Sequence, residues 1–206
     1  MQFLLALLLL AADFPAPSVD APASPAKQKS TIVLAGGCFW GVEAVYRHVQ
    51  GVTEVVSGYS GGSRLTANYA TVSTGFTSHA ESVKITFDPS RISLGKLLQI
   101  YFSVAHDPTE LNRQGPDEGI QYQSAIFFTN DDQKRVAQAY IQQLNQAKVF
   151  SRPIVTQVAP LAGFYAAEEY HQNYIARNPG NPYVVYNDLP KLKRLQQSFP
   201  ELWTGK

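Results

Sequence analysis

The only cysteine of this 206-residue chain has the surroundings that most favour chemistry. Cys38 stands in the hexapeptide Gly-Gly-Cys-Phe-Trp-Gly at 36–41, between an apolar run at 31–35 that is typical of a buried strand and a helical pattern of apolar residues. Two glycines permit a sharp turn, which places Cys38 at a predicted helix N-terminus. Free backbone N–H groups and the helix dipole favour a thiolate there, so we expect a nucleophile, not the small buried apolar residue that a lone cysteine more often is. Phe39 and Trp40 offer an apolar cage beside the sulfur.

A thiolate needs partners that handle protons on the substrate, and one carboxyl and two phenols are candidates. Glu81 stands at the apolar start of a predicted strand, where burial would raise its pKa into the range of a general acid. Its alternative is an ordinary carboxylate at a sheet edge. The phenols of Tyr69 and Tyr122 are placed to donate hydrogen bonds to a developing oxyanion, although most of the eleven tyrosines must serve packing.

Two other chemistries remain open from the residues alone. The chain has four histidines, His48, His79, His106 and His171. One of them paired with Cys38 would make a cysteine–histidine hydrolase or acyl transferase. A metal site would combine His79, Glu81, His106 and Asp107, but these lack the tight helical two-histidine spacing that indicates metal binding, so we expect no metal. A thiol that senses oxidants without catalysing a reaction is the non-enzymatic alternative.

Composition and charge narrow the class of protein. The hydrophobic fraction is 45% and the charged fraction 16%, which is typical of a compact globular chain. The net charge of +1 and the absence of a long basic run give nucleic-acid binding no electrostatic support. We expect one catalytic domain over 30–206 and a monomer.

The first 29 residues differ from the rest. An apolar run at 3–12 precedes a segment rich in Ala, Pro and Ser, which is typical of a secretory signal and a flexible tail, although Met1 and Gln2 supply no basic n-region. Cleavage is expected after Ala12, Ala21 or Ala23, giving an exported, periplasmic protein without stable membrane association. An exported Cys38 needs an external reductant, because the chain has no second cysteine for a disulfide.

The order of predicted elements indicates an α+β fold. Strands are expected at 31–35, 52–57, 82–87, 124–128 and 154–158, helices from Phe39 and at 94–105, 131–147, 164–177 and 189–199, and loops at 58–77 and 106–119. This order favours a two-layer sandwich in which helices pack on a mixed or antiparallel sheet, with a ferredoxin-like split βαβ arrangement.

Short motifs in a fixed order carry a family resemblance. They are Gly-Gly-Cys-Phe-Trp-Gly at 36–41, Gly-Tyr-Ser-Gly-Gly at 58–62, His-Ala-Glu at 79–81, His-Asp-Pro-Thr at 106–109, Gln-Gly at 114–115, Asp117, Gly119, Gln-Tyr at 121–122 and Tyr-His-Gln at 170–172. Between Ile32 and Tyr174 the chain resembles the A-type peptide methionine sulfoxide reductases.

The resemblance implies a role for each matching residue. It implies that Cys38 attacks the sulfur of the S epimer of methionine sulfoxide, free or in proteins, and that Glu81, Tyr69 and Tyr122 act on the sulfoxide oxygen. It places Phe39 and Trp40 around the substrate methyl group, and Asp117 and Tyr174 among the substrate-binding residues. The product state is a sulfenic acid on Cys38, which a thiol must reduce.

Two departures from the family pattern bear on this cycle. Many members resolve the sulfenic acid with a second cysteine near the C-terminus, but 183–206 contains none. We therefore expect no bound cofactor and an external reductant, either a thioredoxin-like or glutaredoxin-like protein or a small thiol. Gln123 stands where the family typically has arginine, which affects a contact behind the site.

Overall fold

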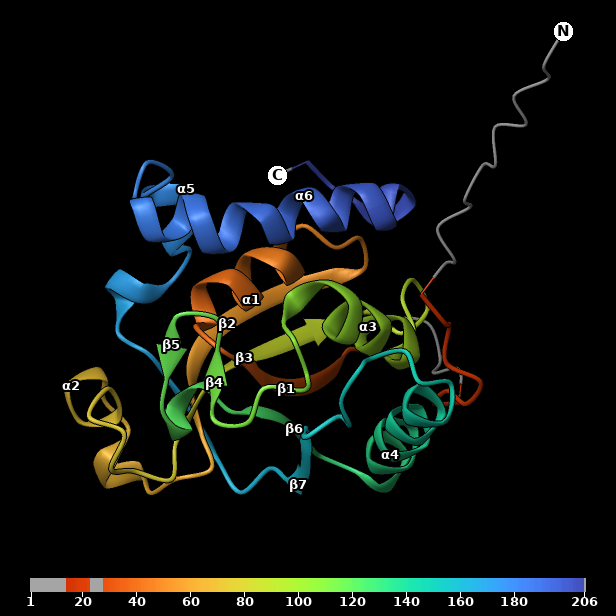
Figure 1. The fold of residues 1–206 in the computed structure, drawn as a ribbon, viewed down its shortest axis with the longest axis horizontal. Helices are drawn as coiled ribbons and strands as arrows, with labels where there is room; N and C mark the ends of the chain where they lie inside the picture. The colour runs from red at the N-terminus through yellow and green to blue at the C-terminus, as the bar shows by residue number, and fades with distance from the viewer. Residues whose placement is uncertain (1–13, 23–27, 206) are drawn as a thin grey trace, which may run out of the picture.

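A mixed sheet of six strands forms the centre of the computed structural model, which describes residues 14–22 and 28–205. Its strands lie side by side in the order β7-β6-β1-β3-β2-β8 (Figure 1). Their bounds are β1 Ser30–Gly36, β2 Val52–Ser60, β3 Ala80–Phe87, β6 Ser124–Phe128, β7 Gln157–Pro160 and β8 Phe164–Ala166. All neighbours are antiparallel except β6 and β7, which pair in parallel.

The four central strands confirm the expected split βαβ arrangement. β1 and β2 are both antiparallel to β3, which lies between them, so β1–α1–β2 is a parallel unit divided by a third strand. β3 and β6 flank β1 in the same way, and α3 connects them. The helices are α1 Phe39–Arg47, α2 Tyr69–Val72, α3 Leu94–Ile100 with a π-helical turn to Ala105, α4 Asp131–Gln146, α5 Tyr174–Arg177 and α6 Leu189–Ser198.

The alternation of side chains along the strands gives the sheet two unequal faces. Leu34 pairs with Val83, and both pack in the main core with the apolar sides of α1, α3 and α4. Glu81 lies two residues before Val83 and therefore on the same face, at the start of β3 and beside the start of α1. The opposite face carries a small apolar cluster that includes Val33 and Phe127. No helix within 14–22 and 28–205 has the length and apolar character needed to span a membrane.

Four segments differ from the expected secondary structure. The segment 164–177, expected as one helix, contains β8, a 3₁₀ turn at Glu169–His171 and the short helix α5, because pairing of β8 with the edge of β2 overrides local helix propensity. The strand expected at 154–158 begins only at Gln157. The expected loops contain α2 and a two-stranded hairpin of β4 Arg113–Gln114 and β5 Asp117–Glu118, which are too short to show periodicity.

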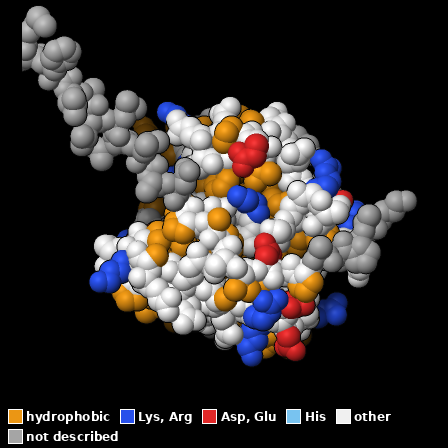
Figure 2. Space-filling model, turned by 90° about the vertical axis from the view of Figure 1, so that its right-hand side faces the viewer, with side chains coloured by type: hydrophobic (Ala, Val, Ile, Leu, Met, Phe, Trp, Pro, Cys, Tyr) orange, Lys and Arg blue, Asp and Glu red, His pale blue; other side chains and the backbone are white. Residues whose placement is uncertain are grey.

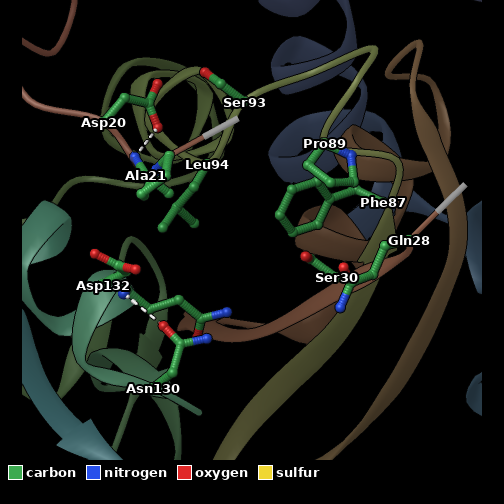
Figure 3. Close-up of a pocket in the computed structure, with 12 residues that line it drawn as sticks. Asp20, Ala21, Gln28, Ser30, Phe87, Pro89, Ser93, Leu94, Asn130 and Asp132 are labelled. Atoms are coloured by element: carbon green, nitrogen blue, oxygen red, sulfur yellow. Dashed lines mark hydrogen bonds between the residues drawn. The ribbon is translucent and has the colours of Figure 1, made fainter. Parts of the chain in front are cut away.

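Residues 14–22, expected to be part of a flexible tail, instead pack against α3 and α4. The side-chain amide of Gln99 donates to the Phe14 carbonyl at 2.8 Å, and the Gly95 backbone N–H donates to Asp20 Oδ1 at 2.9 Å. Figure 2 views this side of the molecule, and Figure 3 shows Asp20 beside Ser93 and Leu94 at the start of α3. A cavity of about 490 Å³ separates Asp20 from Phe87 and Pro89. The predicted secretory signal and most of the expected cleavage sites fall on residues that the structure does not describe.

We expect Asp20→Ala to lower the free energy of unfolding by about 1 kcal/mol, since it removes an acceptor for a free N–H at the start of α3. Thermal unfolding followed by circular dichroism should show a melting temperature about 2–4 °C lower. Asp20→Asn keeps an oxygen acceptor and is the control. Equal melting temperatures for Asp20→Ala and the parent protein would mean that this contact does not stabilise the fold.

Candidate active site

A cavity of about 300 Å³ lies at the N-terminus of α1. It brings together seven of the eight residues expected in the site, contributed by α1, α2, β3, β5 and the turn before β6. Its lining residues are Cys38, Phe39, Trp40, Tyr69, Glu81, Asp117, Tyr122, Asn181 and Tyr183. The long-range pairing of the sheet, together with the turns around it, therefore assembles groups that are distant in sequence.

Cys38 is the N-cap residue of α1, as the sequence predicts, and its side chain is 8% exposed. Gly37 precedes it with φ of 82°, a left-handed conformation that favours glycine. A Cβ there would also lie 2.6 Å from the Gln114 side chain, so a larger residue is doubly disfavoured.

The charge state of the resting thiol differs from the expectation. Burial, followed by the nearby Glu81 and Asp188 carboxyls, raises the pKa of Cys38 well above its usual range. The backbone N–H of Trp40 acts in the opposite direction, but this local effect is smaller than the effect of burial. Cys38 is therefore a protonated thiol at rest, and the predicted stabilised thiolate is incorrect for the free site.

Glu81 is the second residue of β3 and is 3% exposed. Its Oε2 accepts a hydrogen bond of 3.0 Å from the Phe39 backbone N–H, which fixes the carboxyl beside the residue that follows Cys38. Burial raises the pKa of Glu81 to about 8, against the opposing effect of that hydrogen bond. The carboxyl is therefore mostly protonated at neutral pH and able to donate a proton, as the sequence predicts.

The two predicted phenols both line the cavity, and both stay protonated, so that each can donate a hydrogen bond. Burial, and then the charge of Glu81, raises the pKa of both Tyr69 and Tyr122. Glu168 fixes Tyr69 in place, because its Oε1 accepts from the Tyr69 backbone N–H at 2.9 Å and its Oε2 accepts from the Tyr59 hydroxyl at 2.9 Å. The sequence gives no signal for this role of Glu168, which depends on the pairing of β8 with β2.

The aromatic wall is formed by Phe39 and Trp40, and two side chains outside the cavity orient the indole. Tyr174 stacks on Trp40 with ring centroids 3.7 Å apart and an angle of 5° between the planes. The Trp40 Nε1–H donates to Nδ1 of His171 at 3.1 Å. Tyr174, expected to bind substrate, is not among the described residues that line the cavity, so it supports Trp40 from behind.

The opposite wall contains Asp117 and two residues that the sequence analysis missed. Tyr183 donates its hydroxyl hydrogen to Asp117 Oδ2, and Asn181 lies beside it in the cavity wall. Burial raises the pKa of Asp117, while the hydrogen bond from Tyr183 opposes this rise. A sequence signal for Asn181 and Tyr183 is the Asn-Pro-Tyr run at 181–183, whose amide and phenol groups follow the segment expected as a helix at 164–177.

The hydrogen bonds of the histidines do not support a cysteine–histidine pair. His79 Nε2 bonds the Ser63 carbonyl, His106 bonds the Tyr101 carbonyl and the Ser124 hydroxyl, and His171 accepts from Trp40. Burial lowers the pKa of His106 to about 3, so this ring is neutral. Within the part of the chain that the structure describes, no group of three or more His, Cys, Asp or Glu side chains is placed to hold a metal ion.

For methionine sulfoxide, the substrate that the family resemblance implies, we expect Tyr183→Phe to lower kcat/KM about tenfold, mainly by raising KM, since the half-buried Asp117 loses a charge-assisted hydrogen bond. Steady-state kinetics at saturating dithiothreitol would measure this. Tyr186→Phe removes an exposed hydroxyl three residues later and is the matched control. A loss of the same size in both variants would contradict a specific role for the Tyr183 hydroxyl.

Comparisons with known proteins agree with this geometry. The sequence model of one family, described as peptide methionine sulfoxide reductase, matches residues 30–202. A peptide methionine sulfoxide reductase from Mesorhizobium japonicum is 55% identical over 188 residues, covering 91% of this chain and 95% of the relative. One from a Synechocystis species is 51% identical over 187 residues, covering 91% of this chain and 87% of the relative.

Solved structures show the same relationship. Methionine sulfoxide reductase A of Corynebacterium diphtheriae has a TM-score of 0.65 and 33% identity, and the match covers 77% of each chain. The reduced form of Mxr1 from Saccharomyces cerevisiae has a TM-score of 0.67 and 33% identity, covering 79% of this chain and 90% of that one. The α+β fold is thus that of methionine sulfoxide reductases of known structure. This chain belongs to the peptide methionine sulfoxide reductase family, in its A-type branch.

Proposed function

We propose that this chain reduces the S epimer of methionine sulfoxide, free or in proteins, to methionine, and so repairs oxidised proteins. The observation that carries the proposal is one cavity that places a thiol, a protonated carboxyl and two phenols together beside an aromatic wall. Cys38, Glu81, Tyr69 and Tyr122 act on the sulfoxide group, while Phe39, Trp40 and Asp117 hold the substrate.

The reaction reduces the sulfoxide and leaves Cys38 as a sulfenic acid. The Cys38 thiolate attacks the sulfoxide sulfur and forms a sulfur–sulfur bond, while the Glu81 carboxyl donates a proton to the oxygen and Tyr69 and Tyr122 donate hydrogen bonds to it. A second proton, taken from solvent, lets the sulfur–oxygen bond break, and the oxygen leaves as water. A water molecule then attacks the Cys38 sulfur, the sulfur–sulfur bond breaks, methionine leaves with the electron pair of that bond, and Cys38 becomes a sulfenic acid. Cys38 is oxidised by two electrons and the sulfoxide is reduced by two.

The second half of the cycle needs thiols from outside the chain. A first thiol condenses with the sulfenic acid to give a mixed disulfide and water, and a second thiol releases Cys38. Cys38 is the only cysteine of the sequence, so no internal disulfide replaces the first of these steps. We infer that a thioredoxin-like or glutaredoxin-like protein, or a small thiol, is the reductant.

Methionine release with and without dithiothreitol tests the proposed function. The protein should release up to one equivalent of methionine from the S epimer without reductant, and turn over repeatedly when dithiothreitol is present. A hydrolase would be indifferent to the reductant, and an oxidant sensor would form no methionine. Absence of methionine under both conditions, from folded protein with a titratable thiol, would reject the proposal.

We also infer that the chain is exported to the periplasm and that cleavage follows Ala12. Cleavage after Ala21 or Ala23 would remove Phe14 and Asp20, which bond to Gln99 and Gly95 of α3. Cleavage after Ala12 keeps these contacts. The mass of the protein recovered from a periplasmic extract would distinguish the sites, and recovery of the uncleaved chain from the cytoplasm alone would contradict export.

A further inference from the structure

The buried carboxyl of Asp188 lies against the first turn of α1, the helix that begins directly after Cys38. A Cβ atom at Gly41, three residues after Cys38, would overlap Asp188 Oδ1 and would lie 2.5 Å from Lys191 Nζ. Glycine at position 41 therefore leaves the space that these two charged groups occupy. Asp188 ends the turn that leads into α6, so the tertiary fold brings the carboxyl to this place.

Lys191 pairs with this carboxyl inside the protein. Its Nζ donates to Asp188 Oδ1 at 3.1 Å, and both side chains are largely or fully buried. Burial raises the pKa of Asp188, while the charge of Lys191 and the hydrogen bond from it oppose the rise. The second oxygen, Oδ2, is buried without a hydrogen-bond partner among the described residues. A buried ion pair adds little stability and an unpartnered buried oxygen costs free energy, so stability alone does not explain Asp188.

α1 has no anion of its own at this end. Its first turn contains no acidic residue, and the N-cap residue Cys38 makes no side-chain hydrogen bond to the helix. The N-terminus of a helix favours a negative charge, and the Asp188 carboxylate supplies one. A thiolate on Cys38 would place a second negative charge at the same end. Because the two anions repel each other, the Asp188 carboxylate disfavours ionisation of Cys38.

The other ionisable groups around Cys38 do not cancel this effect. They are Glu81 on β3, Tyr69 on α2, Asp117 on β5, Tyr122 and Tyr183 in the cavity wall, and Lys191 on α6. The phenols are neutral, and Glu81 is mostly protonated at neutral pH, which leaves Asp188 as the main carboxylate acting on the thiol. Asp117 has the same sign as Asp188. Lys191 lowers the pKa of Cys38, but by less than Asp188 raises it.

We propose that Asp188 is a positioning residue that keeps Cys38 protonated in the resting site, and that Lys191 holds the Asp188 carboxylate in place and limits its effect. The proposal rests on the proposed function, in which Cys38 is the nucleophile. It assigns the contact at Gly41 a role in controlling when the thiol becomes reactive.

A protonated thiol is protected while the site is empty. The thiolate, not the thiol, reacts with peroxides and alkylating agents, and repeated oxidation leads beyond the sulfenic acid to irreversible products. Cys38 is the only cysteine of the chain, so no second thiol can trap its sulfenic acid as an internal disulfide. Asp188 therefore keeps the nucleophile from reacting with oxidants before substrate arrives.

The rate of alkylation by iodoacetamide between pH 6 and pH 10 tests the proposal, with mass spectrometry reporting on Cys38 alone. We expect Asp188→Asn to be alkylated about three- to tenfold faster than the parent protein at pH 7, because the thiolate fraction rises while its intrinsic nucleophilicity falls slightly. Adding Lys191→Met to Asp188→Asn should return the rate to within about twofold of the parent, since both charges are then absent. Glu201→Gln and Lys193→Met remove exposed charges and are the matched controls.

The opposite signs of the two substitutions separate control of the thiol from a structural role. Parent-like alkylation of Asp188→Asn would overturn the proposal. Faster alkylation of both Asp188→Asn and the double variant would also overturn it, because that pattern means that loosened packing exposes the thiol. Asp188→Ser removes the same charge and should repeat the increase, so it decides the question where Asp188→Asn does not fold. Alkylation needs no substrate, so failure of the parent protein to release methionine from methionine sulfoxide would reject the proposed function and leave this result standing.

Discussion

Cys38→Ser should release no methionine from S-methionine sulfoxide, even in a single turnover without reductant. A serine hydroxyl at this N-cap position is far less acidic than a thiol and is a much poorer nucleophile toward sulfur. The chain also has no other thiol that could form the bond to the substrate sulfur, because Cys38 is its only cysteine. This is the largest effect that any single substitution should produce.

Mass spectrometry after dimedone treatment measures the same step from the protein side. The parent protein, mixed with substrate in the absence of thiols, should gain the mass of one dimedone adduct at Cys38, and Cys38→Ser should gain none. Since the side chain is 8% exposed, unchanged circular dichroism must first show that the variant is folded. Methionine formation by folded Cys38→Ser would place the nucleophile elsewhere and remove the basis of the proposed mechanism.

The sequence predicts the centre of this site well because its groups follow from regular elements. Alternation along β3 puts Glu81 on the same face as Val83, and the start of α1 puts Cys38 beside it. A side chain at the apolar start of a strand is then buried, which is why the raised pKa of Glu81 could be expected. The split βαβ order likewise follows from the succession of strand and helix patterns.

The outer residues of the site cannot be predicted in this way, because their positions depend on long-range contacts. Asp117 lies on a two-residue strand without any periodic pattern, and only the family resemblance indicated it. Asn181 and Tyr183 reach the cavity because the chain before α6 packs back onto α1. No local pattern in 178–183 encodes that return.

The charge state of Cys38 shows the same distinction between local and tertiary effects. A helix N-terminus is visible in the sequence, and it does act on the sulfur through the Trp40 backbone N–H. Burial of the thiol is a property of the assembled fold, with α1, β3 and the C-terminal segment closing around it, and it outweighs the local effect. Deprotonation must therefore be coupled to substrate binding or to proton transfer within the site.

Glu81→Gln should slow methionine formation in a single turnover by about 10²–10⁴-fold at pH 7, the usual contribution of a positioned general acid. The amide keeps the size of the side chain and its acceptor for the Phe39 N–H, but it has no acidic proton for the leaving oxygen. Rapid-quench measurement of methionine formed in the first turnover isolates this step from recycling by dithiothreitol. Glu54→Gln, a carboxyl on β2 outside the cavity, is the matched control.

The pH dependence of the single-turnover rate tests whether Glu81 is the proton donor. The reactive form combines a thiolate with a protonated carboxyl, the pKa of Cys38 is well above its usual range, and the pKa of Glu81 is about 8. Below pH 8 the carboxyl stays protonated while the thiolate fraction grows, so the parent rate should rise about tenfold per pH unit. Above pH 8 the protonated carboxyl is lost as fast as the thiolate is gained, and the parent rate should level off.

Glu81→Gln has no group that titrates at pH 8, so its much lower rate should continue to rise beyond that point. The two profiles should therefore converge as the pH increases from 8 to 9.5. Convergence would assign the break in the parent profile to Glu81 and show that its proton reaches the substrate. A parent profile without a break, or an identical break in Glu81→Gln, would mean that another group donates the proton, and Tyr69 and Tyr122 would then be the next candidates.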